Sequence, residues 1–183
     1  DCVILATAGG RPSPELVVAG INSGANLAEE VLYSGTCSAA MEGALLGIKA
    51  FAISVTEYNS PIFEPAAAYA QSLAAALADY DLPEGVFLNV NVPNLPEGQL
   101  RPPRITRLGR RKYVNQLERR TDPRGRDYYW FSGEPLESDC TEGTDIGAVQ
   151  AGHISVTPVH YDLTWSGNGQ TLAPLVAASW QRG

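Results

Sequence analysis

Several residue types are scarce in this chain, and each scarcity argues against a class of protein. The 183 residues include three cysteines, Cys2, Cys37 and Cys140, which are widely spaced and form no CxxC pair. Neither a disulfide framework nor a zinc site is therefore expected. The two histidines, His153 and His160, lie seven residues apart near a predicted strand and form no standard metal pair. We interpret them as structural or peripheral, with one of them facing a binding site as the alternative.

Several common motifs are also missing. The sequence contains no GxSxG elbow, no GxGxxG dinucleotide fingerprint and no P-loop, which argues against a serine hydrolase and against a dinucleotide-binding oxidoreductase. No apolar run is long enough for a membrane helix, so no membrane partner is expected. The net charge of −7 argues against nucleic acid as a partner, because proteins that bind phosphate backbones concentrate positive charge. With 44% hydrophobic and 18% charged residues, the chain is predicted to form one globular domain over residues 1–183.

The first half of the chain alternates between strand and helix signals. Short unbroken apolar runs predict buried strands at residues 16–19, 50–55 and 86–92. Apolar positions at helical spacing over residues 37–48, and an alanine-rich run over 65–80, predict the helices between them. This βαβαβ order predicts an α/β fold of three layers, Rossmann-like, with a mostly parallel sheet.

Residues 101–133 have a different composition. The segment from 101 to 126 is rich in arginine and poor in aliphatic residues, and four consecutive aromatics follow at 128–131. Because such a segment cannot bury a core of its own, we predict an extended β-hairpin arm that protrudes from the domain. A nucleic-acid surface and a mobile loop over a binding site are the alternatives, and the acidic balance of the chain disfavours the first.

An acidic run follows the predicted arm at residues 137–145. Its residues do not follow the spacing of a calcium-binding loop, which needs a glycine at the sixth position and a terminal glutamate. We expect a solvated loop that ends at a helix cap, with Thr144 or Asp145 opening a short helix through Val149.

Two turns carry the strongest functional signal. Gly20 and Gly24 follow the first predicted strand, and the same turn contains Asn22 and Asn26. The second turn, Ser34-Gly35-Thr36, lies at the N-terminal end of the next predicted helix. Free N–H groups and the positive end of a helix form an anion site, so this arrangement suggests phosphate binding. The alternative is an ordinary Ser/Thr-capped helix after a glycine loop.

Further stretches stand in a defined order with these two turns. They are Ala19-Gly20-Ile21-Asn22-Ser23-Gly24-Ala25-Asn26, Tyr33-Ser34-Gly35-Thr36, Ala40-Met41-Glu42-Gly43, Ala52-Ile53-Ser54, Leu88-Asn89-Val90-Asn91-Val92-Pro93, Tyr128-Tyr129-Trp130, Thr144-Asp145 and Ile154-Ser155-Val156-Thr157-Pro158. The ordered series closely resembles the SurE family, the survival-protein-E nucleotidases. The resemblance extends from about the first residue to Thr164.

The resemblance implies a metal-dependent phosphatase of the cytoplasm. The family are 5′-nucleotidases that hydrolyse nucleoside monophosphates to nucleoside and phosphate, and some members also cleave 3′-nucleotides or short polyphosphate. It implies one divalent cation per subunit, Mg, Mn or Ca, held by two adjacent aspartates, a serine and an asparagine that maps onto Asn22. The substrate-phosphate contacts map onto Asn26, Ser34, Gly35 and Thr36. It also implies a homodimer or homotetramer formed through the arm.

One departure from the family pattern concerns the metal. The family carries its aspartate pair after the first strand, whereas no Asp-Asp pair occurs in this sequence. We expect that pair, and with it the catalytic residues, upstream of Asp1, so that residues 1–183 are expected to form a single α/β domain lacking its N-terminal part. A hard cation needs several oxygen ligands, so these residues alone are expected to be inactive. The alternative is a non-catalytic nucleotide-binding or assembly module, which would need no aspartate pair.

Overall fold

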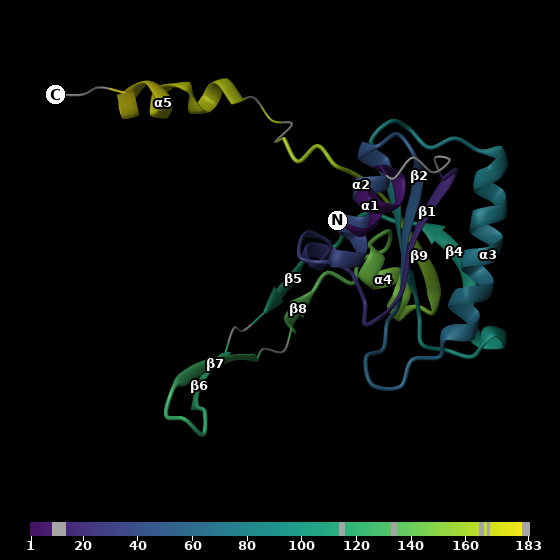
Figure 1. The fold of residues 1–183 in the computed structure, drawn as a ribbon, viewed down its shortest axis with the longest axis horizontal. Coiled ribbons are helices and arrows are strands. Elements are labelled where there is room, and N and C mark those ends of the chain that lie inside the picture. The colour runs from purple at the N-terminus through teal and green to yellow at the C-terminus, as the bar shows by residue number, and fades with distance from the viewer. Residues whose placement is uncertain (9–13, 114–115, 133–134, 165–166, 168, 181–183) are drawn as a thin grey trace.

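A five-stranded sheet with the order β1-β2-β3-β9-β4 forms the centre of the protein (Figure 1). The structure is a computed structural model that describes residues 1–8, 14–113, 116–132, 135–164, 167 and 169–180. The strands of this sheet are β1 (Leu16–Ser23), β2 (Lys49–Val55), β3 (Val86–Val92), β4 (Arg101–Ile105) and β9 (His153–His160).

The sheet is mostly parallel, as the sequence predicts. β1 pairs parallel with β2, β2 pairs parallel with β3, and β4 pairs parallel with β9. The exception is the antiparallel pairing of β9 with β3. The βαβαβ prediction is confirmed for the first three strands, which are connected by α2 (Gly35–Leu45) and α3 (Phe63–Asp79).

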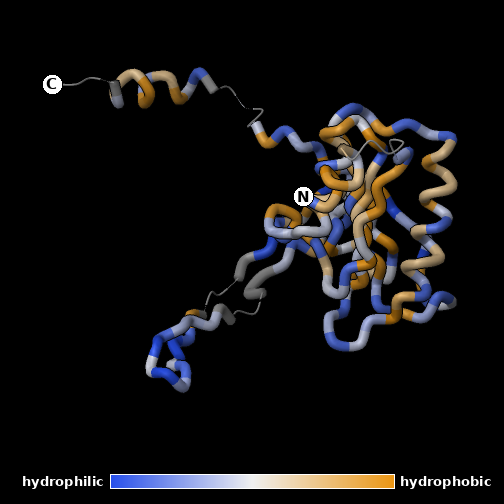
Figure 2. The backbone as a smooth tube through the Cα atoms, viewed as in Figure 1, coloured by the Kyte–Doolittle hydropathy of each residue, from blue (hydrophilic) through white to orange (hydrophobic). Residues whose placement is uncertain are grey.

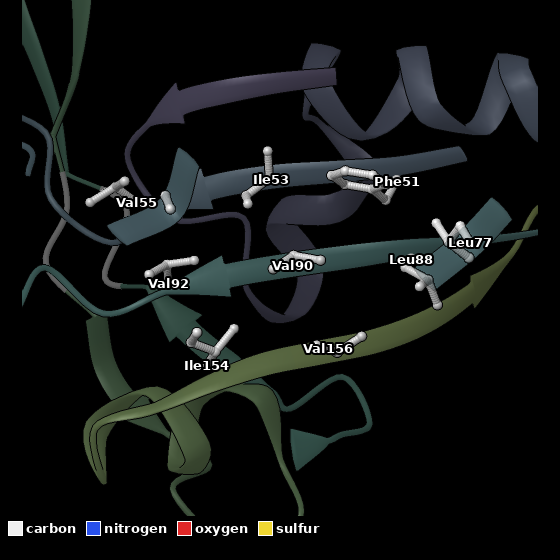
Figure 3. Close-up of a cluster of buried hydrophobic side chains, with 10 residues drawn as sticks. Phe51, Ile53, Val55, Leu77, Leu88, Val90, Val92, Ile154 and Val156 are labelled. Atoms are coloured by element: carbon white, nitrogen blue, oxygen red, sulfur yellow. The ribbon is translucent and has the colours of Figure 1, made fainter. Parts of the chain in front are cut away.

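Side chains alternate between the two faces of the sheet, and each face packs against a helix. Phe51, Ile53 and Val55 of β2 belong to the cluster that packs against α3, together with alternate residues of β3 and β9 (Figure 3). Ala50 and Ala52 belong to the second cluster, which packs against α2. The three predicted layers are therefore confirmed, with Ala50 and Ala52 next to Phe87 on the α2 face of the sheet.

The remaining helices flank this sandwich. They are α1 (Cys2–Ala8), α4 (Asp145–Gln150), α5 (Ala173–Trp180) and the 3₁₀ helices η1 (Ala28–Leu32), η2 (Glu97–Gln99) and η3 (Gly169–Leu172). Figure 1 shows α5 at a distance from the sheet, near the C-terminus. Its side chains Leu175 and Val176 are exposed. No helix in the described part of the chain has the length and apolar character needed to cross a membrane.

A β-ribbon arm extends from the domain between β4 and α4. It comprises β5 (Arg111–Tyr113) paired antiparallel with β8 (Pro135–Ser138), and β6 (Gln116–Thr121) paired antiparallel with β7 (Asp127–Ser132). Figure 2 shows that its outer end is hydrophilic in contrast to the sandwich. The predicted hairpin is confirmed.

The predicted start of the arm at residue 101 is wrong, and its predicted end at 133 is too early. Residues Arg101–Ile105 form β4, which pairs with β9, and the ribbon continues to Ser138. The side chains of β4 are exposed throughout, because β4 is an edge strand of the sheet. An edge strand can carry arginine and proline, so its sequence does not have the apolar run of a central strand.

Candidate functional site

Gly20 and Asn22 lie in the last part of β1, after a shift in its pairing with β2, and Gly24 follows the strand. This is the end at which the parallel strands β1 and β2 both finish, the edge at which α/β proteins bind ligands. Gly20 has φ +132° and Gly24 has φ +105°. Residues with a side chain rarely adopt such positive φ angles, which explains why both positions are glycine. The N–H of Gly24 donates to the carbonyl of Val55 (3.0 Å), which ties the turn to the end of β2. Asn22 lies opposite Ser54 in the register of these strands.

Asn22 is half-buried and its amide has a fixed orientation. Its Nδ2 donates to the carbonyl oxygen of Gly24 at 2.9 Å. Among the residues that the structure describes, the Oδ1 atom accepts no hydrogen bond. Asn22 therefore presents one neutral oxygen at the edge of the sheet.

The described residues provide only part of a site for the divalent cation that the resemblance implies. Such ions take about six or more oxygen ligands, with carboxylates prominent among them. Asn22 fits as one ligand. Within the described ranges, no group of three or more His, Cys, Asp or Glu side chains is placed to hold a metal ion. These residues therefore account for one neutral ligand and not for a complete site.

Asn26 is buried and is held by two asparagines of β3. The side-chain amide of Asn91 pairs with the Asn26 backbone in both directions: Oδ1 accepts from the N–H (2.8 Å) and Nδ2 donates to the carbonyl (3.1 Å). Nδ2 of Asn89 donates to the same carbonyl at 2.8 Å. The Nδ2 of Asn26 donates to Oγ of Ser54 at 2.5 Å. A buried network in which both backbone groups of Asn26 are bonded fixes the backbone of Asn26 in one position.

The second turn caps helix α2. Ser34 is the N-cap, with extended backbone, and its Oγ accepts from the N–H of Cys37 at 3.1 Å. The side chain of Ser34 therefore makes the bond of a helix cap, and its contact with a substrate phosphate stays a prediction. Gly35 has open space around its Cα, since a Cβ at this position would meet no neighbouring atom within 4 Å. The hydroxyl of the half-buried Thr36 makes no hydrogen bond within the described part of the chain, so it remains available to an anion.

The two turns meet through a buried contact between β3 and α2. The Cys37 thiol, in the first turn of α2, donates to Oδ1 of Asn89 at 3.5 Å. Asn89 is also the residue that binds the Asn26 carbonyl. Burial raises the pKa of the Cys37 thiol, and the bond to Ser34 opposes this shift. Cys37 is thus a protonated donor that helps to join the Ser34–Thr36 turn to Asn26.

Sequence reasoning missed the roles of Ser54, Asn89 and Asn91. The signal was present: Asn89 and Asn91 are two residues apart in an otherwise apolar strand, so they face the same side of the sheet. Two buried amides on one face need hydrogen-bond partners, and the adjacent asparagine turn supplies them.

The other predicted residues have structural roles. Thr144 caps α4, its Oγ1 accepting from the N–H of Gly147 at 3.0 Å. Nδ1 of His153 lies 2.8 Å from the carbonyl of Pro102, and Nδ1 of His160 accepts from the N–H of Asp162 at 2.8 Å. The Nδ1 atom of each histidine thus has a backbone partner, and both residues are far in sequence from the two turns. This agrees with a structural role for both.

The capping and phosphate-binding roles of the second turn can be separated by alanine substitutions. Ser34→Ala removes a cap bond and is expected to cost about 1 kcal/mol in the free energy of unfolding. Thr36→Ala is expected to raise the inhibition constant for inorganic phosphate with little effect on the melting temperature. Both quantities are measured on each variant. If the Thr36→Ala variant binds phosphate with normal affinity, the turn serves only as a helix cap.

The fold and these contacts define an α/β protein in which two turns are joined by buried hydrogen bonds at the carboxyl edge of its sheet. The family model described as "Survival protein SurE" matches residues 1–115. The chain is 50% identical to the 5′-nucleotidase SurE of Heliobacterium modesticaldum over 151 residues, covering 82% of this chain and 56% of that protein. It is 47% identical to the 5′-nucleotidase SurE of Moorella thermoacetica over 181 residues, covering 98% of this chain and 70% of that protein. The chain belongs to the SurE family.

A solved structure agrees with this assignment. The crystal structure of the SurE protein from Aquifex aeolicus superposes with a TM-score of 0.77 and 37% sequence identity, covering 98% of this chain and 72% of that chain. The chain spans 56% and 59% of the length of the Heliobacterium and Symbiobacterium thermophilum relatives.

Proposed function

We propose that the intact protein is a metal-dependent 5′-nucleotidase that hydrolyses nucleoside monophosphates to nucleoside and phosphate. The observation that carries this proposal is the joining of Asn22, Asn26 and the α2 turn at one edge of the sheet through Ser54 and Asn89. The identity to relatives named 5′-nucleotidase SurE supports the reaction and the substrate class. Activity on 3′-nucleotides and short polyphosphate, as in some family members, belongs to the same proposal.

Each residue of the site has a proposed task. Asn22 would supply one neutral ligand to a Mg, Mn or Ca ion, and the aspartate pair expected upstream of Asp1 would supply anionic ligands. The cation would provide charge that neutralises the phosphoryl oxygens. Asn26, with its backbone fixed by Asn91 and one Nδ2 hydrogen bonded to Ser54, would offer its second Nδ2 hydrogen to the substrate phosphate. Gly35 and Thr36 would hold the phosphoryl oxygens with donors that need little reorganisation during the reaction.

The test is phosphate release by the intact protein. We expect turnover of nucleoside 5′-monophosphates in Mg²⁺ or Mn²⁺, lost on chelation and restored by added metal.

Sequencing the intact protein is expected to show an Asp-Asp pair after an apolar strand upstream of Asp1. Nucleotide binding without turnover in any divalent metal would favour the alternative, a non-catalytic nucleotide-binding or assembly module.

We further propose a cytoplasmic homo-oligomer, a dimer or a tetramer, that associates through the arm and has neither nucleic acid nor membrane as a partner. The aromatic residues Tyr128, Tyr129 and Trp130 of β7 are 42%, 53% and 55% exposed in the single chain. The Arg120 guanidinium lies 5.5 Å from the centroid of the Trp130 ring. Exposed aromatics at this density usually contact a partner surface, and a second copy of the arm is such a surface.

Deleting the ribbon is expected to reduce the assembly and leave the sheet intact. Because Arg111 and Ser138 are paired in the register of β5 and β8, residues 112–137 can be replaced by a short turn. Light scattering is expected to give a smaller particle for the deletion variant, and a cooperative thermal unfolding transition is expected to show that the sheet and its helices still fold. An intact protein that is monomeric at micromolar concentration would contradict the proposed role of the arm.

A further inference from the structure

The root of the arm is bonded directly to the segment that follows Asn26. Arg111 is the first residue of β5, and its backbone N–H donates to Oε2 of Glu29 in η1 at 2.9 Å. Its Nη1 donates to Oε1 of Glu30 at 2.8 Å. The two side chains of this ion pair are only 17% and 28% exposed, so solvent screens the pair less than a surface pair.

Glu30 also bonds to the backbone of the segment that precedes η1. Its second oxygen, Oε2, accepts from the backbone N–H of Leu27 at 3.0 Å. Leu27 immediately follows Asn26, whose own N–H and carbonyl are held by β3. One carboxylate therefore joins the first residue of the arm to the residue next to Asn26.

Asp145 forms a second bridge of the same kind. It is fully buried at the start of α4. Its Oδ2 accepts from the N–H of Ala28 at 2.8 Å, and its Oδ1 accepts from the N–H of Gly109, two residues before β5, also at 2.8 Å. Ala28 has φ +52°, an unusual conformation for a residue with a side chain, and the Asp145 bond helps to hold it there.

We propose that Glu30 and Asp145 are positioning residues that link the arm to the phosphate site. Each uses one oxygen for the Leu27–Ala28 segment and the other for the root of the arm. Charge-assisted bonds of this kind are stronger and more directional than neutral ones. The placement of the arm, and with it the assembly formed through the arm, thereby restrains the segment that follows Asn26, in addition to the bonds by which β3 holds the Asn26 backbone. This inference rests on the proposed phosphate-binding role of Asn26.

The test measures the dissociation constant of inorganic phosphate by calorimetry on the intact, metal-loaded protein. Glu30→Gln keeps the shape of the side chain but leaves only one oxygen for two donors. It is expected to raise the dissociation constant about ten-fold, the size expected for one lost charged bond. KM for the nucleotide should rise more than kcat falls. Asp145→Asn is expected to act in the same direction, with a lower melting temperature because its site is fully buried.

The Arg111→Met variant shows whether Glu30 acts through its bond to the arm or only through its bond to the Leu27 backbone. Arg111 bonds to Glu29 and Glu30 rather than to Asn26, yet its replacement is expected to weaken phosphate binding by about the same factor as Glu30→Gln. The double variant should be no weaker than either single one, which is the signature of coupled residues. Asp127→Asn, in an ion pair with Arg119 within the ribbon, is the matched control and should leave phosphate affinity unchanged.

The outcomes distinguish this inference from the proposed function. If Asn26→Ala weakens phosphate binding but Glu30→Gln and Arg111→Met do not, the link to the arm is wrong and the phosphate site stands. If Asn26→Ala has no effect on phosphate affinity, the phosphate-binding role of Asn26 is itself wrong. Light scattering on every variant shows whether the assembly is retained while the affinity changes.

Discussion

Asn22→Ala in the intact protein is expected to lower phosphatase activity about 100-fold and to weaken divalent-metal affinity. Losses of about this size are typical when a residue that supports a metal site, or one that stabilises the charge of the transition state, is removed. The Asn22 amide is oriented by its bond to the Gly24 carbonyl, so its Oδ1 points away from that contact. Activity is measured over a titration of Mg²⁺ or Mn²⁺, and metal affinity is measured separately by calorimetry.

Asn59→Ala is the matched control for this substitution. Asn59 is an exposed asparagine in the segment that follows β2, and its backbone N–H donates to Oε1 of Glu57. Its replacement should leave both activity and metal affinity unchanged. Full activity of Asn22→Ala at saturating metal, with unaltered metal affinity, would remove Asn22 from the proposed ligand set.

Gly20→Ala is expected to destabilise the fold by about 3 kcal/mol or more in the free energy of unfolding. Gly20 has φ +132°, and a Cβ there would lie 2.3 Å from the carbonyl oxygen of Ile53. This contact is with backbone of the adjacent strand, so it can be relieved only by moving β1 away from β2. Backbone strain and steric overlap therefore add together. Urea denaturation measures the change.

Gly47→Ala separates the two contributions. Gly47 also has a positive φ of +73°, but a Cβ there would meet no neighbouring atom within 4 Å. Only the conformational cost remains, which is about 1 kcal/mol. If both variants lost the same stability, the close approach of Gly20 to β2 would not contribute.

The sequence predicts the centre of the fold well because burial there imposes a clear pattern. The apolar runs of β2 and β3 and the helical spacing of α2 each depend on local contacts with a known period. β4 was missed because its exposed edge position imposes no apolar pattern. The antiparallel β9 could not be oriented from the sequence, because the whole arm lies between β4 and β9.

The candidate site was predicted in part. Asn22, Asn26 and the Ser34–Thr36 turn could be proposed because glycine turns and a helix start mark them locally. Their support comes from side chains far away in sequence: Asn91 lies 65 positions from Asn26, and Asp145 lies 117 positions from Ala28. No local pattern predicts such partners, since they depend on which strands become neighbours. The structure also shows that the side chain of Ser34 is used as a cap, which the turn motif alone left open.

The buried thiol of Cys37 makes the opening of the α2 turn observable in solution. Cys2 and Cys140 are exposed, whereas Cys37 is fully buried and its pKa is raised by burial. An alkylating reagent reacts with thiolates, so it should modify the two exposed cysteines first and reach Cys37 only when the beginning of α2 separates from β3. In a Cys2→Ser, Cys140→Ser background, the labelling rate of Cys37 reports the free energy of that local opening. Bound phosphate or nucleotide would then slow the labelling in proportion to how firmly it holds the turn closed.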